Sequence, residues 1–245
     1  APSQPSRTHR LVRNANALVA AGHDVTVVTP VVEQAFVEFD REIIRTSGWR
    51  YVPVHLLDER HRLPFATRAR RKLMSKFLEW HAIPSIGSSA LMYGEGDVAR
   101  AVSYLDADLY LGQQQAALPL VAHVARIKNK PYACDIEDIL TGSDTESVSL
   151  MLSIERKFLP AAAVVSTMSE VAAEYLDKQH ALPHKVVPLH NCASAIERTA
   201  VHPPSANVPS LPSIYWFGQT LGPHSLAIEL IQANALAGNR FRIVL

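Results

Sequence analysis

The chain is 245 residues long, with 48% hydrophobic and 19% charged residues. This composition can bury a sizeable core, in one large or two smaller domains, and excludes a disordered chain. The 24 Lys and Arg residues and 23 Asp and Glu residues leave a net charge of +1, which excludes the strong positive field of a typical nucleic-acid-binding protein.

Helices and strands alternate along the sequence. An amphipathic helix over residues 6–21 has Ser6 as its N-cap and Gly22 just past its end. Apolar residues spaced three and four apart predict further helices over 116–128, 145–159 and 169–181. Short β-branched runs predict strands over 24–29, 51–56, 108–112, 131–135, 163–167, 185–189 and 213–217. The alternation implies parallel strands joined by right-handed crossovers, so we predict an α/β protein with a doubly wound, Rossmann-like parallel sheet.

A proline-rich stretch over 202–212 excludes helix and interior strand, and predicts an interdomain linker. We place the first domain at 1–205, the linker at 206–212 and a second Rossmann-like domain at 213–245. The second domain shows one βαβ unit, with a helix over 225–237 and a strand beginning at Phe241. Because the chain opens on a turn-like segment and stops within a strand, we expect the first domain to lack its first strand and the second to be truncated.

Polar side chains follow several predicted strands at their carboxyl ends, where open parallel sheets bind ligands. They are Gln113, the acidic group Asp135, Glu137 and Asp138, then Ser169, and His190 with Asn191. We expect one shared crevice, in which a carboxylate accepts hydrogen bonds from sugar hydroxyls or takes a proton from an attacking one. The alternatives are that the aspartates cap a loop or helix and that Ser169 caps the helix after it, which is the role we favour for Ser169. The spacing of histidines fits no metal motif, so we expect no metal site.

The order of these segments resembles the GT-B glycosyltransferases grouped as glycosyltransferase family four. The matching segments are GHDVTVVT (22–29), CDIEDI (134–139), VVSTMSEVAAEYL (164–176), VPLHN (187–191) and IYWFGQTLGP (214–223). The resemblance implies two facing Rossmann-like domains, the first binding a sugar acceptor and the second a nucleotide diphosphate sugar. It also implies retaining transfer of a sugar to a glycan, lipid-linked or small-molecule acceptor, without a cofactor.

Within this resemblance, Asp135, Glu137 and Asp138 are the candidate catalytic residues. The candidate substrate-binding residues are Arg7, Gln113, Ser169, Asn191, Gly218 and Gln219. Gln219 stands where the family usually has basic residues after the glycine, and the donor domain is short, so we expect the chain as it stands to transfer no sugar. Two alternatives remain open: a non-catalytic glycan-binding or scaffold protein of the same descent, and a nucleotide-sugar epimerase of GT-B type.

Residues 60–76 carry many basic side chains and no Asp or Glu, and apolar residues follow directly. The basic residues are Arg60, Arg62, Arg68, Arg70, Arg71, Lys72 and Lys76. Such a stretch can rest on anionic lipid headgroups, so peripheral contact with the inner membrane face is one expectation. The alternative, which we favour from the sequence, is a solvated helix with its apolar side in the core. Cys134 and Cys192 lack close CxxC spacing, which suits a reducing compartment, and we expect a cytoplasmic protein.

Overall fold

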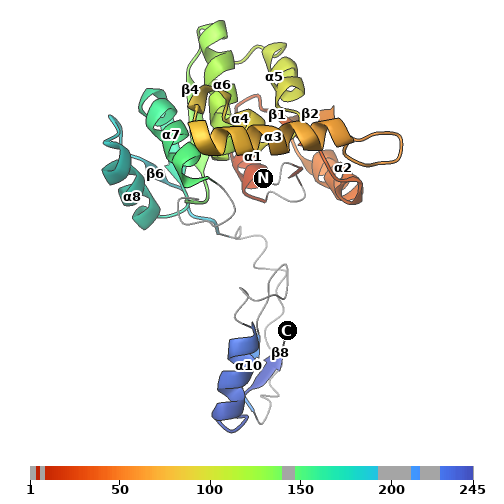
Figure 1. Cartoon of the computed structure of the whole chain (residues 1–245), viewed down its shortest axis with the longest axis vertical. Coiled ribbons are helices and arrows are strands. Elements are labelled where there is room, and N and C mark those ends of the chain that lie inside the picture. The colour runs from red at the N-terminus through yellow and green to blue at the C-terminus, as the bar shows by residue number, and fades with distance from the viewer. Residues whose placement is uncertain (1–3, 6–8, 140–146, 193–210, 216–226, 245) are drawn as a thin grey trace. The chain divides into compact units, whose positions relative to one another are not determined.

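The structure, a computed structural model, describes residues 4–5, 9–139, 147–192, 211–215 and 227–244 (Figure 1). The chain divides into two compact units, Ala1–Asn191 (unit 1) and Cys192–Leu245 (unit 2), which are described separately. None of the helices within these ranges is long and apolar enough to cross a lipid bilayer.

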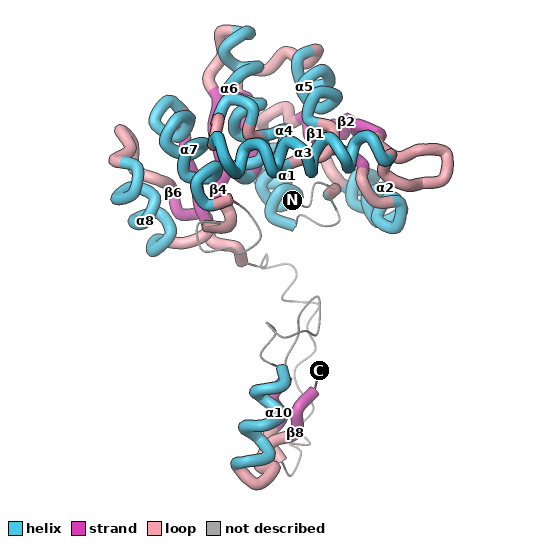
Figure 2. The backbone as a smooth tube through the Cα atoms, in the orientation of Figure 1, coloured by secondary structure: helices cyan, strands magenta, loops and turns pink. Residues whose placement is uncertain are grey.

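Unit 1 alternates helices and strands along its described residues (Figures 1 and 2). Its strands are β1 (Thr26–Val31), β2 (Arg50–His55), β3 (Tyr110–Gln113), β4 (Tyr132–Ile136), β5 (Val164–Thr167) and β6 (Val187–Pro188). Its longer helices are α1 (His9–Ala20), α2 (Val37–Thr46), α3 (Phe65–His81), α5 (Glu95–Ser103), α6 (Gln114–Lys128), α7 (Val148–Phe158) and α8 (Glu170–His180). The shorter helical segments are η2 (Gln34–Phe36), η3 (Pro84–Ile86), α4 (Ser88–Leu91) and η5 (Leu159–Ala161).

All strand pairs of unit 1 are parallel. β1 pairs with β2, and a four-stranded sheet has the order β3-β4-β5-β6. The predicted fold class, α/β with Rossmann-like parallel strands, is confirmed. The described strands nevertheless form two sheets instead of the single one expected, because β1 and β3 share no ladder. Along the chain, α3, α4 and α5 separate β2 from β3.

The main core of unit 1 forms where α6 packs on β3 and β4. Leu118 and Val124 of α6 are buried together with Cys134 and Ile136 of β4. Successive side chains of a strand point to opposite faces, so Asp135 points away from this core. A second, smaller core forms where Ala15 of α1 packs with Val27 and Trp49.

Gly112 allows α6 to lie close to β3. A Cβ atom at this position would stand 2.8 Å from Cγ2 of Val121 and 3.4 Å from Cβ of Ala117. A side chain here would push the helix away from the strand, since a packed interior leaves no room for extra atoms. The glycine therefore fixes where the next residue, Gln113, emerges at the carboxyl end of β3.

The described residues of unit 2 form one βαβ element. It consists of β7 (Ser213–Tyr215), α10 (Ala227–Leu236) and β8 (Arg242–Val244), and the two strands are parallel. The predicted boundary at residue 205 and most of the predicted linker at 206–212 lie outside the described residues, so the domain limits stay a prediction.

Candidate functional site

A buried ion pair organises the carboxyl edge of the four-stranded sheet. Nε and Nη2 of Arg10, in the first turn of α1, donate to Oδ2 and Oδ1 of Asp135 at 2.7 Å each. The two side chains are 3% and 1% exposed. Nη1 of Arg10 donates to the carbonyl oxygen of Leu189, also at 2.7 Å. One guanidinium thus ties α1 to the end of β4 and to the loop after β6.

The carboxylate of Asp135 has further partners. Oγ of Ser166, on β5, donates to Oδ1 at 2.6 Å, and Nδ2 of Asn14 donates to Oδ2 at 3.2 Å. Hydrogen bonding to this carboxylate raises the pKa of Arg10. Both oxygens of Asp135 are occupied inside the protein, so it is not placed to take a proton from a substrate. We therefore propose that Asp135 positions α1 and the loop after β6, instead of the catalytic role predicted from the sequence.

Glu137 lies two residues further on, just past the end of β4, and is half-buried. Nδ2 of Asn191 donates to Oε1 of Glu137 at 3.3 Å, and Nη1 of Arg13 donates to Oδ1 of Asn191 at 3.0 Å. Partial burial raises the pKa of Glu137, and the neighbouring carboxylate of Asp138 adds to the effect. A carboxylate with a raised pKa is a better proton acceptor, so Glu137 has the chemistry expected of the site.

Amide side chains from the start of α6 border the acidic loop. Oε1 and Nε2 of Gln114 make two long hydrogen bonds to Asp138, each of 3.5 Å, to its backbone nitrogen and to Oδ2. Gln114 has a φ of 66°, a conformation that costs energy for a residue with a side chain and that recurs at functional sites. Gln113 stands opposite Asp135 in the β3–β4 register. In the described part of the chain, no hydrogen-bond partner reaches its buried Nε2.

Ser169 is the N-cap of α8. Its Oγ accepts from the backbone nitrogen of Ala172 at 3.2 Å, which is the role favoured from the sequence. Close by, Nε2 of His190 lies 3.0 Å from Oε1 of Glu170, and both side chains are exposed. Substrate binding by Ser169 stays a prediction.

The structure thus brings Gln113, Asp135, Glu137, Asp138 and Asn191 to one edge of the sheet, as expected for residues after parallel strands. Three of the candidate residues, Arg7, Gly218 and Gln219, lie outside the described residues. Within the described ranges, no group of three His, Cys, Asp or Glu side chains is arranged to hold a metal ion.

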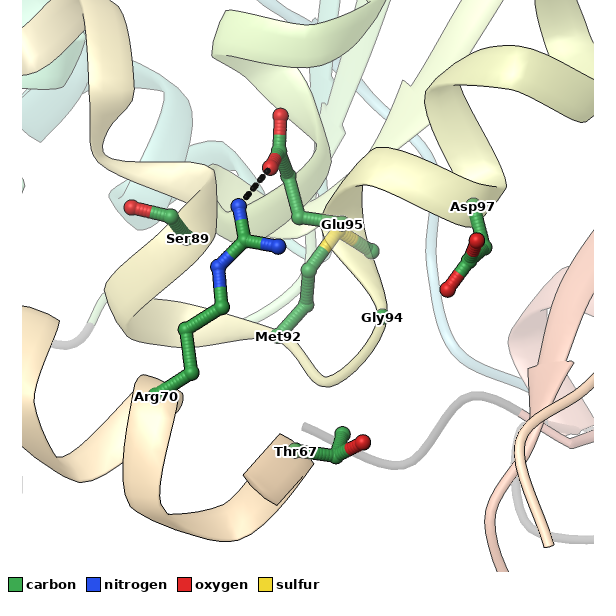
Figure 3. Close-up of a pocket in the computed structure, with 7 residues that line it drawn as sticks. All are labelled: Thr67, Arg70, Ser89, Met92, Gly94, Glu95 and Asp97. Carbon is green, nitrogen blue, oxygen red and sulfur yellow. Dashed lines mark ion pairs between the residues drawn. The ribbon is translucent and has the colours of Figure 1, made fainter. Parts of the chain in front are cut away.

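A small pocket lies elsewhere in unit 1, between α3 and the segment from α4 to α5 (Figure 3). It is lined by Thr67, Arg70, Ser89, Met92, Gly94, Glu95 and Asp97. Arg70 and Glu95 face each other across it at 3.7 Å. None of the predicted site residues lines this pocket, and we assign it no ligand.

The residues that form the carboxyl edge of the sheet lie within a stretch that matches a known protein family. A family model described as a glycosyl transferase 4-like domain matches residues 8–192. The chain belongs to this family. The match includes α1, the acidic loop and Asn191, and it confirms the resemblance drawn from the sequence motifs. No curated protein matches the chain in sequence.

Two solved structures of Arabidopsis thaliana UGT89C1 are similar in fold. The complex with UDP-L-rhamnose has a TM-score of 0.51 and 10% identity, over 97% of this chain and 63% of that one. The complex with UDP has a TM-score of 0.51 and 14% identity, over 98% of this chain and 62% of that one. At these identities the likeness shows the fold, which is that of GT-B glycosyltransferases. The present glycosyl transferase 4-like chain spans about three fifths of the length of those structures.

Sequence reasoning missed the residues that support the acidic loop. Arg10 and Asn14 were not among the predicted site residues, yet both donate to Asp135. Their spacing of four residues places them on one face of α1, and that spacing was the available signal. Ser166 stands directly opposite Asp135 in the β4–β5 register, so it too was predictable once the strands were paired.

Proposed function

We propose that the protein is a glycosyltransferase that moves a sugar from a nucleotide diphosphate sugar to an acceptor hydroxyl. The observation that carries the proposal is the family match over residues 8–192, which contains a half-buried carboxylate at the open edge of a parallel sheet. UGT89C1, whose fold is similar, was solved with UDP-L-rhamnose and with UDP, which supports a nucleotide sugar as donor.

In this reaction the acceptor oxygen bonds to the anomeric carbon while the bond from that carbon to the diphosphate oxygen breaks. The nucleoside diphosphate leaves with the electron pair, and the hydroxyl proton passes to the carboxylate of Glu137. We assign Glu137 to the acceptor side, where its carboxylate accepts a hydrogen bond from the attacking hydroxyl and orients it. Asn191 positions Glu137 through the 3.3 Å hydrogen bond. Asp138 contacts the N-terminal end of α6 by accepting a hydrogen bond from Gln114.

Two details of the proposal rest on the family. The first is that transfer retains the anomeric configuration, and the second is that the acceptor is a glycan, a lipid-linked molecule or a small molecule. Proton NMR of the first-formed product would decide the configuration. An inverted anomeric centre would contradict retention while leaving glycosyl transfer itself intact.

The test compares Glu137→Gln with Glu174→Gln, which changes an exposed carboxylate on α8. Release of nucleoside diphosphate would be followed over a panel of UDP- and GDP-sugars, with and without candidate acceptors. The same assay tests the expectation drawn from the sequence that the chain as it stands transfers no sugar, which acceptor-dependent release from the wild type would contradict. In any form of the protein that shows such release, Glu174→Gln should keep the wild-type rate and Glu137→Gln should lose about 10²- to 10⁴-fold in kcat/KM. Equal rates with and without acceptor would favour hydrolysis or epimerisation of the donor over transfer.

A further inference from the structure

The outer face of α3 carries a stripe of exposed apolar side chains. Phe65, Leu73, Phe77 and Trp80 are 79%, 69%, 43% and 86% exposed. Leu73, Phe77 and Trp80 follow the i, i+4, i+7 spacing that places residues on one helical face. α3 crosses the front of unit 1 in Figure 1. We call these four residues the outer stripe.

The opposite face of α3 is the one that packs inward. Leu78 is fully buried and Met74 packs against the main core. Arg71 holds this inner face: its Nε donates to the carbonyl oxygen of Ala90 at 3.1 Å and its Nη1 to Oη of Tyr93 at 3.2 Å. The core thus fixes the rotation of α3, and the outer stripe is left in water. The favoured sequence interpretation, in which the apolar side of the helix lies in the core, therefore holds for Leu78 and Met74, while Leu73, Phe77 and Trp80 form a second apolar face outside it.

Cationic side chains border the outer stripe. Lys72 and Lys76 lie beside it on the helical wheel and are exposed. Glu79 is the single acidic residue within α3. On the other border, Arg70 reaches Glu95 at 3.7 Å, as Figure 3 shows. The exposed surface of this helix therefore combines an apolar stripe with a border of positive charge.

We propose that α3 is a membrane-surface helix that docks on a bilayer containing anionic lipids. Leu73, Phe77 and Trp80 enter the boundary between headgroups and acyl chains, and Lys72 and Lys76 reach the lipid phosphates. Aromatic and aliphatic residues backed by lysines are the composition of helices that lie in this boundary. The positive border supplies charge complementarity to phosphate. This inference does not depend on the glycosyltransferase proposal, because it concerns a different surface.

The experiment uses the full chain with vesicles of phosphatidylcholine alone or mixed with phosphatidylglycerol. We expect flotation with the mixed vesicles and a blue shift of tryptophan emission, because the exposed Trp80 would leave water. Trp49 is 4% exposed and gives a nearly constant background, and the third tryptophan, Trp216, is replaced by phenylalanine in every sample so that Trp80 reports the change. In Trp80→Phe the blue shift should disappear while flotation persists. Flotation of the wild type without any shift would contradict insertion of the outer stripe.

Variants separate the apolar and the cationic contributions. Leu73→Ser should weaken vesicle binding by about tenfold, because the inserted apolar area is lost. Lys72→Gln and Lys76→Gln should each weaken it by about fivefold on anionic vesicles. Tyr104→Ser, which changes a side chain that is 82% exposed just past the end of α5, is the matched control and should bind as the wild type does. If Leu73→Ser instead abolishes a dimer seen by sedimentation without lipid, the stripe binds a second copy and the membrane proposal is wrong.

Discussion

At the scale of single residues, the candidate site is organised by a buried charge pair. Arg10 brings a positive charge against Asp135 and holds the loop after β6 through Leu189. The half-buried Glu137 and the exposed Asn191 extend from the two segments that the pair connects. The pair therefore controls how Glu137 and Asn191 meet.

Replacing Arg10 should cost much more than removing a surface charge. Arg10→Met leaves Asp135 buried without its main partner, which typically destabilises a protein by about 3–5 kcal/mol. Urea unfolding followed by circular dichroism measures this free energy of unfolding. Arg41→Met, which removes an exposed pair with Glu38, serves as the control and should leave the midpoint unchanged. A small effect of Arg10→Met would mean that water reaches Asp135.

The raised pKa of Glu137 gives stability a pH dependence. The folded protein holds this proton more tightly than the unfolded chain does, because burial disfavours the charged carboxylate. The protonated Glu137 contributes fully to stability below the pKa that it has in the unfolded chain. This contribution is lost as the pH rises through the pKa that it has in the folded protein. Glu137→Gln cannot ionise, so it should have a higher urea midpoint than the wild type at about pH 7 and no advantage at about pH 4. An advantage that is the same at both pH values would show that ionisation is not the cause.

The positions of the acidic loop and Asn191 were predictable because a parallel sheet gathers its carboxyl ends on one edge. The role of Asp135 was not predictable in this way. A sequence shows that a carboxylate follows a strand, but whether its oxygens are free depends on α1, whose Arg10 is 125 residues away in sequence. The periodicity of α1 pointed to its apolar residues, and the buried arginine lies outside that pattern.

At the scale of elements, the ends of helices and strands follow local chemistry. α1 ends before Gly22, whose φ of 90° suits a residue without a Cβ atom. The strand expected over 185–189 is reduced to Val187–Pro188, and before it the backbone nitrogen of Val186 donates to Oδ1 of Asp177 at 3.2 Å. α3 was predicted as basic and amphipathic, but its apolar stripe faces outward. Amphipathicity shows that a helix has two faces and leaves open which of them the core selects.

The N-cap of α8 offers a test at this scale. Ser169→Ala removes the acceptor for the Ala172 amide and should destabilise unit 1 by about 1 kcal/mol. Ser169→Asp should retain stability, since aspartate caps as well and its charge favours a helix N-terminus. The two variants would be compared by urea unfolding. If activity falls in Ser169→Asp while stability is retained, Ser169 also contacts the substrate.

At the scale of the whole molecule, the two units differ in how much they bury. Unit 1 holds a core built from several helices and both sheets, whereas Ala227 is the only buried hydrophobic residue among the described residues of unit 2. Leu236 in α10 is 91% exposed. Local stability follows buried apolar contact, so the two units should not open together.

Hydrogen exchange should separate the two units. We expect backbone amides of α10 to exchange well before those of α6 and β4, because α10 has few buried contacts to protect it. Mass spectrometry of peptides covering 227–244 and 114–136 would follow both in one experiment. Residues of α8, at the periphery of unit 1, provide an internal comparison. Equal protection of α10 and α6 would show that unit 2 unfolds only with the rest of the chain.

The pair between Arg10 and Asp135 also sets an order of events during synthesis on the ribosome. The two residues are 125 positions apart, an interval of roughly 6–25 s at about 5–20 residues per second. Until β4 has been made, the guanidinium stays in water, since burying it alone is costly. The nascent chain can thus pack Ala15 of α1 on Val27 and Trp49 early, while the first turn of α1 reaches its final place only after β4 has been made.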